Sequence, residues 1–253
     1  MKINLRVGLG LIGLICLAQP AQAQWQNGNL ALRTNGNVFQ SGDQLRIEVT
    51  ALDEVIESFS TQVVYAYNEE VEEKDDDGNV THKQVERTRQ RDSGPVIESL
   101  GKYQSLLLDD RFHFGDSSPA GWYEVRVSIF QANTKRLLAN LRTCVFYQSA
   151  SADDPSKTSC DLFLRNMKRV NNEMFWSFDG QFKLNARYSV VLFRANRVVK
   201  HIDSGAYAGH VREFNLASPE LEGLTGQSYD ILVHDHQSGR SSTLAKAAIP
   251  SAQ

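Results

Sequence analysis

Apolar and polar residues alternate one by one through several long stretches of this chain, and this alternation is what most constrains its fold. The pattern is clear in residues 44–51, 123–129 and 182–192. Successive side chains of a β-strand point to opposite faces, so the alternation predicts strands with one face on a core and the other in water. Such strands are typical of antiparallel sheets.

Short clusters of turn-forming residues separate these stretches. Each cluster contains a glycine, and they lie at 35–37, 41–43, 77–79, 118–121, 179–180 and 238–239. No window predicts a long amphipathic helix. Many short strands separated by such turns favour an all-β fold built from antiparallel β-sandwiches.

A polar segment divides the chain into two pieces of sandwich size. Residues 149–159 contain a proline and no apolar residue larger than alanine, which is typical of a linker. We therefore expect two tandem immunoglobulin-like β-sandwiches, over 24–148 and 160–250, joined by the linker 149–159.

The first 23 residues have the features of a cleaved signal peptide. Lys2 and Arg6 flank the start of the apolar run 7–18, and Ala21-Gln22-Ala23 offers a small-residue cleavage site. The apolar run is too short to span a bilayer, and no later run approaches the necessary length. The sequence therefore predicts an exported protein, periplasmic or secreted, with no membrane insertion after removal of residues 1–23.

Export changes the interpretation of the cysteines. Cleavage leaves only Cys144 and Cys160, one on each side of the linker. Cysteines of exported proteins are usually paired, so we expect a disulfide here, with two buried free thiols as the alternative. The bond would hold the two ends of the linker together and restrict the hinge between the domains.

Part of the second domain resembles fibronectin type III domains. Residues 221–233 resemble the corner before strand F and strand F itself, with Tyr229 matching the tyrosine whose hydroxyl bonds back to the corner. Trp176 matches the tryptophan that packs the core in that family, and Tyr188 opens a segment similar to strand C. The resemblance implies an immunoglobulin-like sandwich but no particular ligand, because this scaffold hosts many functions.

The first domain is generically similar to bacterial immunoglobulin-like and macroglobulin-like domains. Residues 118–127 resemble the turn and the penultimate strand of those domains, and residues 39–45 resemble the entry into their second strand. This resemblance concerns the fold alone.

The charge of the chain argues against nucleic-acid binding. The formal net charge is −3, and it becomes −5 without residues 1–23, which carry Lys2, Arg6 and no acidic residue. Nucleic-acid binders normally show a basic surplus. The sequence also offers no glycine-rich phosphate loop and no defensible pair of catalytic carboxylates, so we expect neither a cofactor nor enzymatic activity.

Residues 62–91 are the most unusual segment of the sequence. The first half becomes strongly acidic and the second half is basic, which predicts a hairpin that pairs Val71 with Val85. This register sets Glu73 opposite Lys83 and Glu69 opposite Arg87. The hairpin would be either a solvated arm or an arm that docks a partner, and these four charged residues are the candidate partner-binding residues.

Two patterns are weak candidates for metal ligands. Asp75, Asp77 and Asn79 partly imitate a calcium-binding loop. This segment lacks the bidentate glutamate that such a loop requires at its twelfth position. His234 and His236 lie two residues apart on a predicted strand, so their rings share a face, but no spacing supplies a third ligand.

These observations favour an exported, non-enzymatic binding protein of the bacterial cell envelope or the extracellular space, with a protein or a glycan as its partner. The expected surfaces are the sandwich edges, the charged hairpin and the cleft between the domains. The alternatives are a carbohydrate-binding module that uses Trp25 or Trp122 as a platform, a calcium-dependent module, and a secreted metal-dependent enzyme that uses His234 and His236.

Overall fold

The computed structural model describes residues 28–55, 57–74, 78–91, 94–148, 160–169, 175–217 and 219–251. The predicted signal peptide, 1–23, and the predicted linker, 149–159, lie outside these ranges. Strands make up nearly all of the regular structure that is described, with one short 3-10 helix, η1 (Pro219–Leu224). The all-β prediction is therefore confirmed. No helix within the described ranges is long and apolar enough to cross a membrane.

The first sandwich consists of two sheets that face each other across one core. One sheet is antiparallel and contains β1 (Leu30–Thr34), β3 (Gln44–Ala51) and β6 (Ser105–His113). The other layer contains β4 (Phe59–Lys74), β5 (Val80–Arg91), β7 (Gly121–Gln131) and β8 (Leu137–Tyr147), and the short β2 (Val38–Phe39) pairs with β8. As the alternation predicts, Ile47 and Val49 of β3 and Val125 and Val127 of β7 are buried in this core.

The second sandwich has the same two-layer plan. One antiparallel sheet contains β9 (Met167–Arg169), β10 (Phe175–Asp179) and β13 (Glu213–Ala217). The other layer contains β11 (Arg187–Arg194), β12 (Arg197–Ala206), β14 (Ser228–Asp235) and β15 (Arg240–Ala248). Strand β11 begins later than the alternation at 182–192 suggests: Leu184 is exposed, whereas Tyr188, Val190 and Leu192 are buried in the core.

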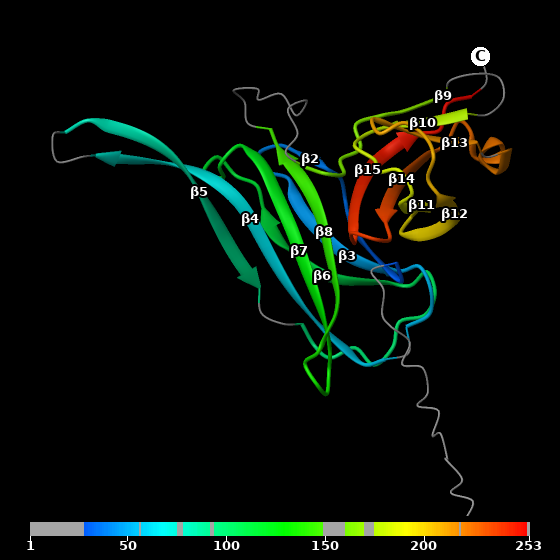
Figure 1. The fold of residues 1–253 in the computed structure, drawn as a ribbon, viewed down its shortest axis with the longest axis horizontal. Coiled ribbons are helices and arrows are strands. Elements are labelled where there is room, and N and C mark those ends of the chain that lie inside the picture. The colour runs from blue at the N-terminus through cyan, green and yellow to red at the C-terminus, as the bar shows by residue number, and fades with distance from the viewer. Residues whose placement is uncertain are drawn as a thin grey trace, which may run out of the picture.

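The two sandwiches share a sheet, which the sequence did not predict. Strand β15 pairs with β8 in parallel, so that Arg240 lies opposite Arg142 and Ser241 lies opposite Thr143. This pairing joins one layer of each sandwich into a nine-stranded sheet that runs from β12 to β5 (Figure 1). The backbone of the first sandwich is therefore bonded directly to that of the second.

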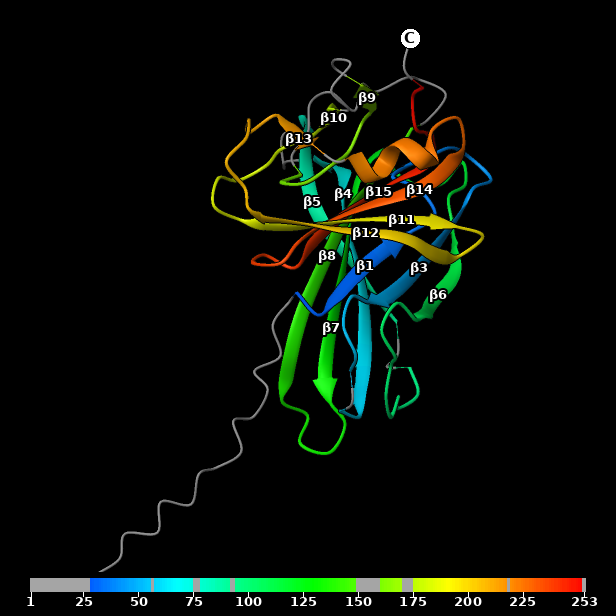
Figure 2. The same ribbon diagram turned by 90° about the vertical axis from the view of Figure 1, so that its right-hand side faces the viewer.

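A buried arginine of β1 also ties the sandwiches together. Arg33 Nη1 donates a hydrogen bond to Glu48 Oε2 of the first sandwich at 3.2 Å. Its Nη2 donates to Asn196 Oδ1 and Asp230 Oδ2 of the second sandwich, both at 3.0 Å, and its guanidinium lies 4.1 Å from the ring centroid of Phe193. Strand β1 lies beside the layer that contains β11 and β14 (Figure 2). An apolar cluster surrounds this ring: Ala31, Leu52, Val191, Phe193 and Leu232.

Cys144 of β8 and Cys160 form a disulfide, as the sequence predicts. Their Cα atoms are 6.3 Å apart, so the bond holds the beginning of the second sandwich beside β8. Trp122, Phe146 and Phe163 pack in the same small cluster as the two cysteines. The disulfide therefore acts near the line along which β8 and β15 pair.

A buried carboxylate lies at the edge of the first sandwich. Asp109 of β6 accepts hydrogen bonds from the Tyr65 hydroxyl at 2.6 Å, from Arg111 Nε at 2.9 Å and from Arg91 Nε at 3.2 Å. Burial acts to raise the pKa of Asp109, but the hydrogen bonds from Tyr65 and Arg111 outweigh it and lower the pKa below its ordinary value. Burial and the contact with Asp109 raise the pKa of Tyr65.

Candidate functional site

The hairpin of β4 and β5 extends beyond the rest of its sheet. β4 pairs with β7 only from Phe59 to Tyr67, and in the described part of the chain residues 68–74 and 80–86 pair only with each other. Figure 1 shows this end of the hairpin projecting from the body of the protein. We call residues 68–86 the ribbon. Its described side chains are exposed or half-buried.

The hairpin forms as predicted, but the predicted register is wrong by two residues. Val71 lies opposite Lys83 instead of Val85. Both predicted ion pairs nevertheless form: Arg87 Nε donates to Glu69 Oε2 at 2.8 Å, and Lys83 Nζ lies 3.7 Å from Glu73 Oε1. They are diagonal contacts, because long side chains reach a neighbour two positions along the partner strand. The four candidate partner-binding residues therefore come together, with Glu69, Glu73 and Lys83 on the ribbon and Arg87 next to its base.

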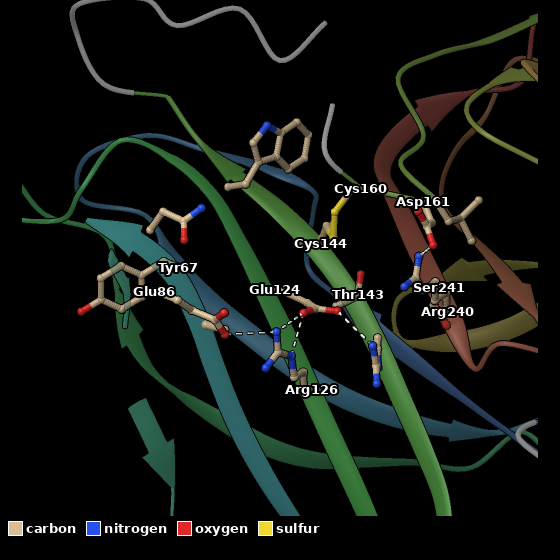
Figure 3. Close-up of a pocket in the computed structure, with 15 residues that line it drawn as sticks. Tyr67, Glu86, Glu124, Arg126, Thr143, Cys144, Cys160, Asp161, Arg240 and Ser241 are labelled. Carbon is tan, nitrogen blue, oxygen red and sulfur yellow. Dashed lines mark hydrogen bonds and ion pairs between the residues drawn. A yellow bond between two sulfur atoms is a disulfide. The ribbon is translucent and has the colours of Figure 1, made fainter. Parts of the chain in front are cut away.

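A cleft of about 290 Å³ opens where the ribbon meets the shared sheet (Figure 3). It crosses β4, β7, β8 and β15. Asn68 and Glu86, at the base of the ribbon, line the cleft together with Asp161 and Arg240 of the second sandwich. The cleft is therefore continuous with the ribbon and is formed by both sandwiches.

Acidic and basic side chains alternate along this cleft. Four ion pairs join them (Figure 3): Glu86–Arg126 at 3.3 Å, Glu124–Arg126 at 2.6 Å, Glu124–Arg142 at 3.8 Å, and Asp161–Arg240. The hydrogen bond to Glu124 raises the pKa of Arg126. Burial and the neighbouring Arg142 lower the pKa of Arg240. The cleft therefore offers fixed charges of both signs.

Apolar groups line the same cleft. Trp122 of β7 is half-buried, and its ring centroid lies 5.0 Å from that of Phe146 and 4.8 Å from that of Phe163. The disulfide also lines the cleft. Trp25, the other predicted sugar platform, lies outside the described residues. Carbohydrate binding by Trp122 stays a prediction.

His234 and His236 lie together, with ring centroids 5.4 Å apart. His234 Nδ1 is 2.8 Å from Ser241 Oγ, and His236 Nε2 is 2.7 Å from Ser189 Oγ. His201 Nε2 contacts the same Ser189 hydroxyl at 2.8 Å. Burial lowers the pKa of both His201 and His236, and the nearby Arg187 lowers both further. Lys102 also lowers the pKa of His201, whereas Asp203 acts to raise both values and Asp235 acts to raise that of His236.

These histidines belong to the contact between the sandwiches. The hydroxyl of Tyr103, from the first sandwich, lies 3.0 Å from His201 Nδ1. The backbone N–H of Leu32 in β1 donates to Ser241 Oγ, which also contacts His234. The three rings are therefore placed where the second sandwich meets the first.

Metal binding stays a prediction for both candidate sets. Asp75 and Asp77 lie outside the described residues, and Asn79 lies on the described part of the ribbon. Across the ranges that the structure describes, no group of three or more His, Cys, Asp or Glu side chains is placed to hold a metal ion.

The arginines of the cleft were missed by sequence reasoning. Arg126, Arg142 and Arg240 come from β7, β8 and β15, and no local motif links them. Alternation along β7 places Arg126 on the face opposite Val125, away from the core. The sequence pattern of β15 does not indicate that Arg240 lies in the same cleft as Arg126, because the position of Arg240 depends on the pairing of β15 with β8.

Comparisons with known proteins concern the fold alone. No protein-family model matches the chain, and no curated protein matches its sequence. The alpha-2-macroglobulin of E. coli matches 85% of this chain over 14% of its own, with 7% identity and a TM-score of 0.27. Red sea bream transglutaminase matches 86% of this chain over 31% of its own, with 10% identity and a TM-score of 0.24.

A third match covers nearly the whole of the matched protein, again with low identity and a low TM-score. The E. coli chaperone DraB matches 84% of this chain over 95% of its own, with 11% identity and a TM-score of 0.25. The chain spans less than a third of the macroglobulin and of the transglutaminase. Likenesses this distant support no argument about activity or partners.

Proposed function

We propose that this protein is an exported, non-enzymatic binding protein that docks a protein partner through the ribbon and the cleft at its base. The observation that carries this proposal is the length of the ribbon beyond the last residue of β4 that pairs with β7. Seven residues in each strand, at roughly 3.3 Å per residue, extend it by about 23 Å. An isolated two-stranded ribbon is marginally stable in water, so contact with a partner accounts for this length better than folding does.

The charges of the ribbon suit a docking surface. Charged side chains on an edge strand discourage non-specific strand pairing. The pairs Glu69–Arg87 and Glu73–Lys83 are exposed, and such pairs contribute only about 0–1 kcal/mol to folding. They give the ribbon a fixed charge pattern that a complementary surface can recognise.

Export and a non-catalytic role are parts of the same proposal. The sequence of residues 1–23 supports export, and so does the disulfide, which is typical of oxidising compartments. Glu86, Glu124 and Asp161 in the cleft are each engaged by an arginine. Carboxylates held in this way are suited to fixed contacts more than to proton transfer.

Cross-linked affinity capture from the cell envelope and the medium tests the proposal. The intact protein is compared with a shortened variant in which Asn-Gly replaces residues 69–85. Asn68 and Glu86 are register partners, so a two-residue turn can close the hairpin at this point. The cut retains Glu86 and its ion pair with Arg126.

We expect the intact protein to capture a partner that the shortened variant does not capture. A second variant, E69R with R87E, keeps an ion pair at these positions but reverses its direction, and it should also capture less of the partner. Equal unfolding free energies of the three proteins serve as the control for folding. Equal capture by all three proteins would contradict the proposal.

A further inference from the structure

Two arginines from different sandwiches lie on neighbouring strands and line the same cleft. The parallel pairing of β8 with β15 sets Arg142 directly opposite Arg240, and both residues line the cleft. Like charges directly opposite each other on paired strands repel. Glu124 acts on both arginines and offsets part of this repulsion, and an anion shared by the two guanidinium groups would offset the rest.

The carboxylates of the protein leave room for such an anion. Glu124 is 3.8 Å from Arg142, but it makes its closer contact, at 2.6 Å, with Arg126. Among the described residues, no hydrogen bond engages the guanidinium of Arg142, whose side chain is 43% exposed. Asp161 pairs with the Nη1 atom of Arg240. Each of the two arginines therefore has N–H groups free to bind a further acceptor.

The shape and lining of the cleft indicate what accompanies the anionic group. Trp122, Leu162 and the disulfide line the cleft beside the two arginines. A volume of about 290 Å³ is enough for a group the size of an aromatic ring and its substituent. The lining therefore suits a ligand that combines one anionic group with an apolar body.

We propose that Arg142 and Arg240 form a site for a carboxylate whose apolar body packs beside Trp122 and the disulfide. A guanidinium presents a planar fork of N–H donors that matches the two oxygens of a carboxylate. The carboxylate comes either from a free small acid or from an acidic side chain of the docked partner. The second source rests on the proposed function, and the first does not.

Calorimetric titration of the full chain with phenylacetate tests the site. Phenylacetamide has the same apolar body without the charge, and inorganic phosphate has charge without an apolar body. We expect phenylacetate to bind at least tenfold more tightly than either. Quenching or enhancement of tryptophan fluorescence by phenylacetate, lost in W122F, should place the ligand in the cleft.

Substitutions that should weaken binding and one that should strengthen it make the test more specific. R142Q and R240Q should each weaken phenylacetate binding about tenfold or more, because each removes charge-assisted hydrogen bonds. D161N should strengthen binding by about threefold, because it removes the carboxylate that competes for Arg240. Arg136 is exposed in the turn between β7 and β8, so R136Q is the matched control and should bind as the wild type does.

Three results would overturn the proposal: equal binding of phenylacetate and phenylacetamide, equal binding of phenylacetate and phosphate, or wild-type affinity in both R142Q and R240Q.

These results are independent of the ribbon, so the shortened variant should bind phenylacetate normally even where it captures no partner. Phenylacetate that competes with partner capture would assign the carboxylate to the partner. Phenylacetate that binds without affecting capture would assign it to a free acid.

Discussion

Replacing Arg33 with methionine should loosen the contact between the two sandwiches. Methionine fills much of the same space but removes the guanidinium that contacts Glu48, Asn196 and Asp230. Breaking a buried ion pair costs about 3–5 kcal/mol. We expect about 2–4 kcal/mol here, because Asp230 is 29% exposed and can be rehydrated while Glu48 keeps its ion pair with Arg46.

Arg46→Met is the matched control for this substitution. Arg46 pairs with the same Glu48 at 2.6 Å, but it is 44% exposed and both partners belong to β3. Because the Arg46 side chain is partly solvated and Glu48 keeps its contact with Arg33, we expect R46M to cost only about 0–1 kcal/mol. R46M therefore removes a positive charge from the same carboxylate but, among the described residues, no hydrogen bond or ion pair to the second sandwich.

Amide hydrogen exchange measures the contact directly. The backbone N–H groups of Leu32 and Thr34 donate across the interface to Ser241 Oγ and Thr243 Oγ1, each at 3.2 Å. In R33M the protection of these two amides should fall by roughly 30- to 700-fold, which corresponds to about 2–4 kcal/mol. The free energy of unfolding from guanidinium denaturation should fall with it.

One experimental outcome would contradict the role of Arg33 in this contact. Protection of Leu32 and Thr34 that is the same in R33M and R46M, with a stability loss below about 1 kcal/mol in both, would refute it. In that case the β8–β15 pairing and the apolar cluster hold the sandwiches together without help from the guanidinium.

Three further predictions concern stability. Reducing the disulfide, whose cysteines are 16 residues apart, should lower the unfolding free energy by about 3 kcal/mol, measured by denaturation with and without reductant. Tyr65→Phe should cost about 1–3 kcal/mol at pH 7 by removing a hydrogen bond to the buried Asp109. Because the folded pKa of Asp109 is lowered, that cost should disappear as the pH falls below 3.8 and through the folded pKa; a constant cost in acid would contradict it. His201 and His236 have lowered pKa values in the folded protein, so the unfolded chain takes up protons first and stability should fall as the pH drops below about 6.5. A double variant with glutamine at both positions should show a smaller fall between pH 7 and pH 5, and an equal fall would count against these two residues.

The sequence predicts those features that local periodicity or residue type controls. Alternation identifies Ile47 and Val125 as core residues, because a half-buried strand presents only one of its faces to the core. The disulfide follows from the expected export, because cleavage of residues 1–23 would leave only Cys144 and Cys160. The charged hairpin also follows from a local pattern, since its two arms differ in sign and are joined by a glycine-containing turn.

Features that depend on contacts between distant segments could not be predicted. The register of the ribbon is an example, because exposed ion pairs are weak and a shift of two residues leaves the same charges within reach. The β8–β15 pairing is another, since it involves two register pairs and no distinctive residue pattern. Arg142 and Arg240 are ordinary strand residues until this pairing places them opposite each other.

The proposed carboxylate site therefore depends on the docking of the sandwiches. Arg142 belongs to the first and Arg240 to the second, whereas Arg33 holds the interface elsewhere and does not line the cleft. R33M should then weaken phenylacetate binding although both cleft arginines are intact. By the same linkage, saturating phenylacetate should increase the protection of the Leu32 and Thr34 amides, because a ligand that binds only the docked form stabilises that form. Unchanged protection at saturation would show that the cleft and the Arg33 contact respond independently.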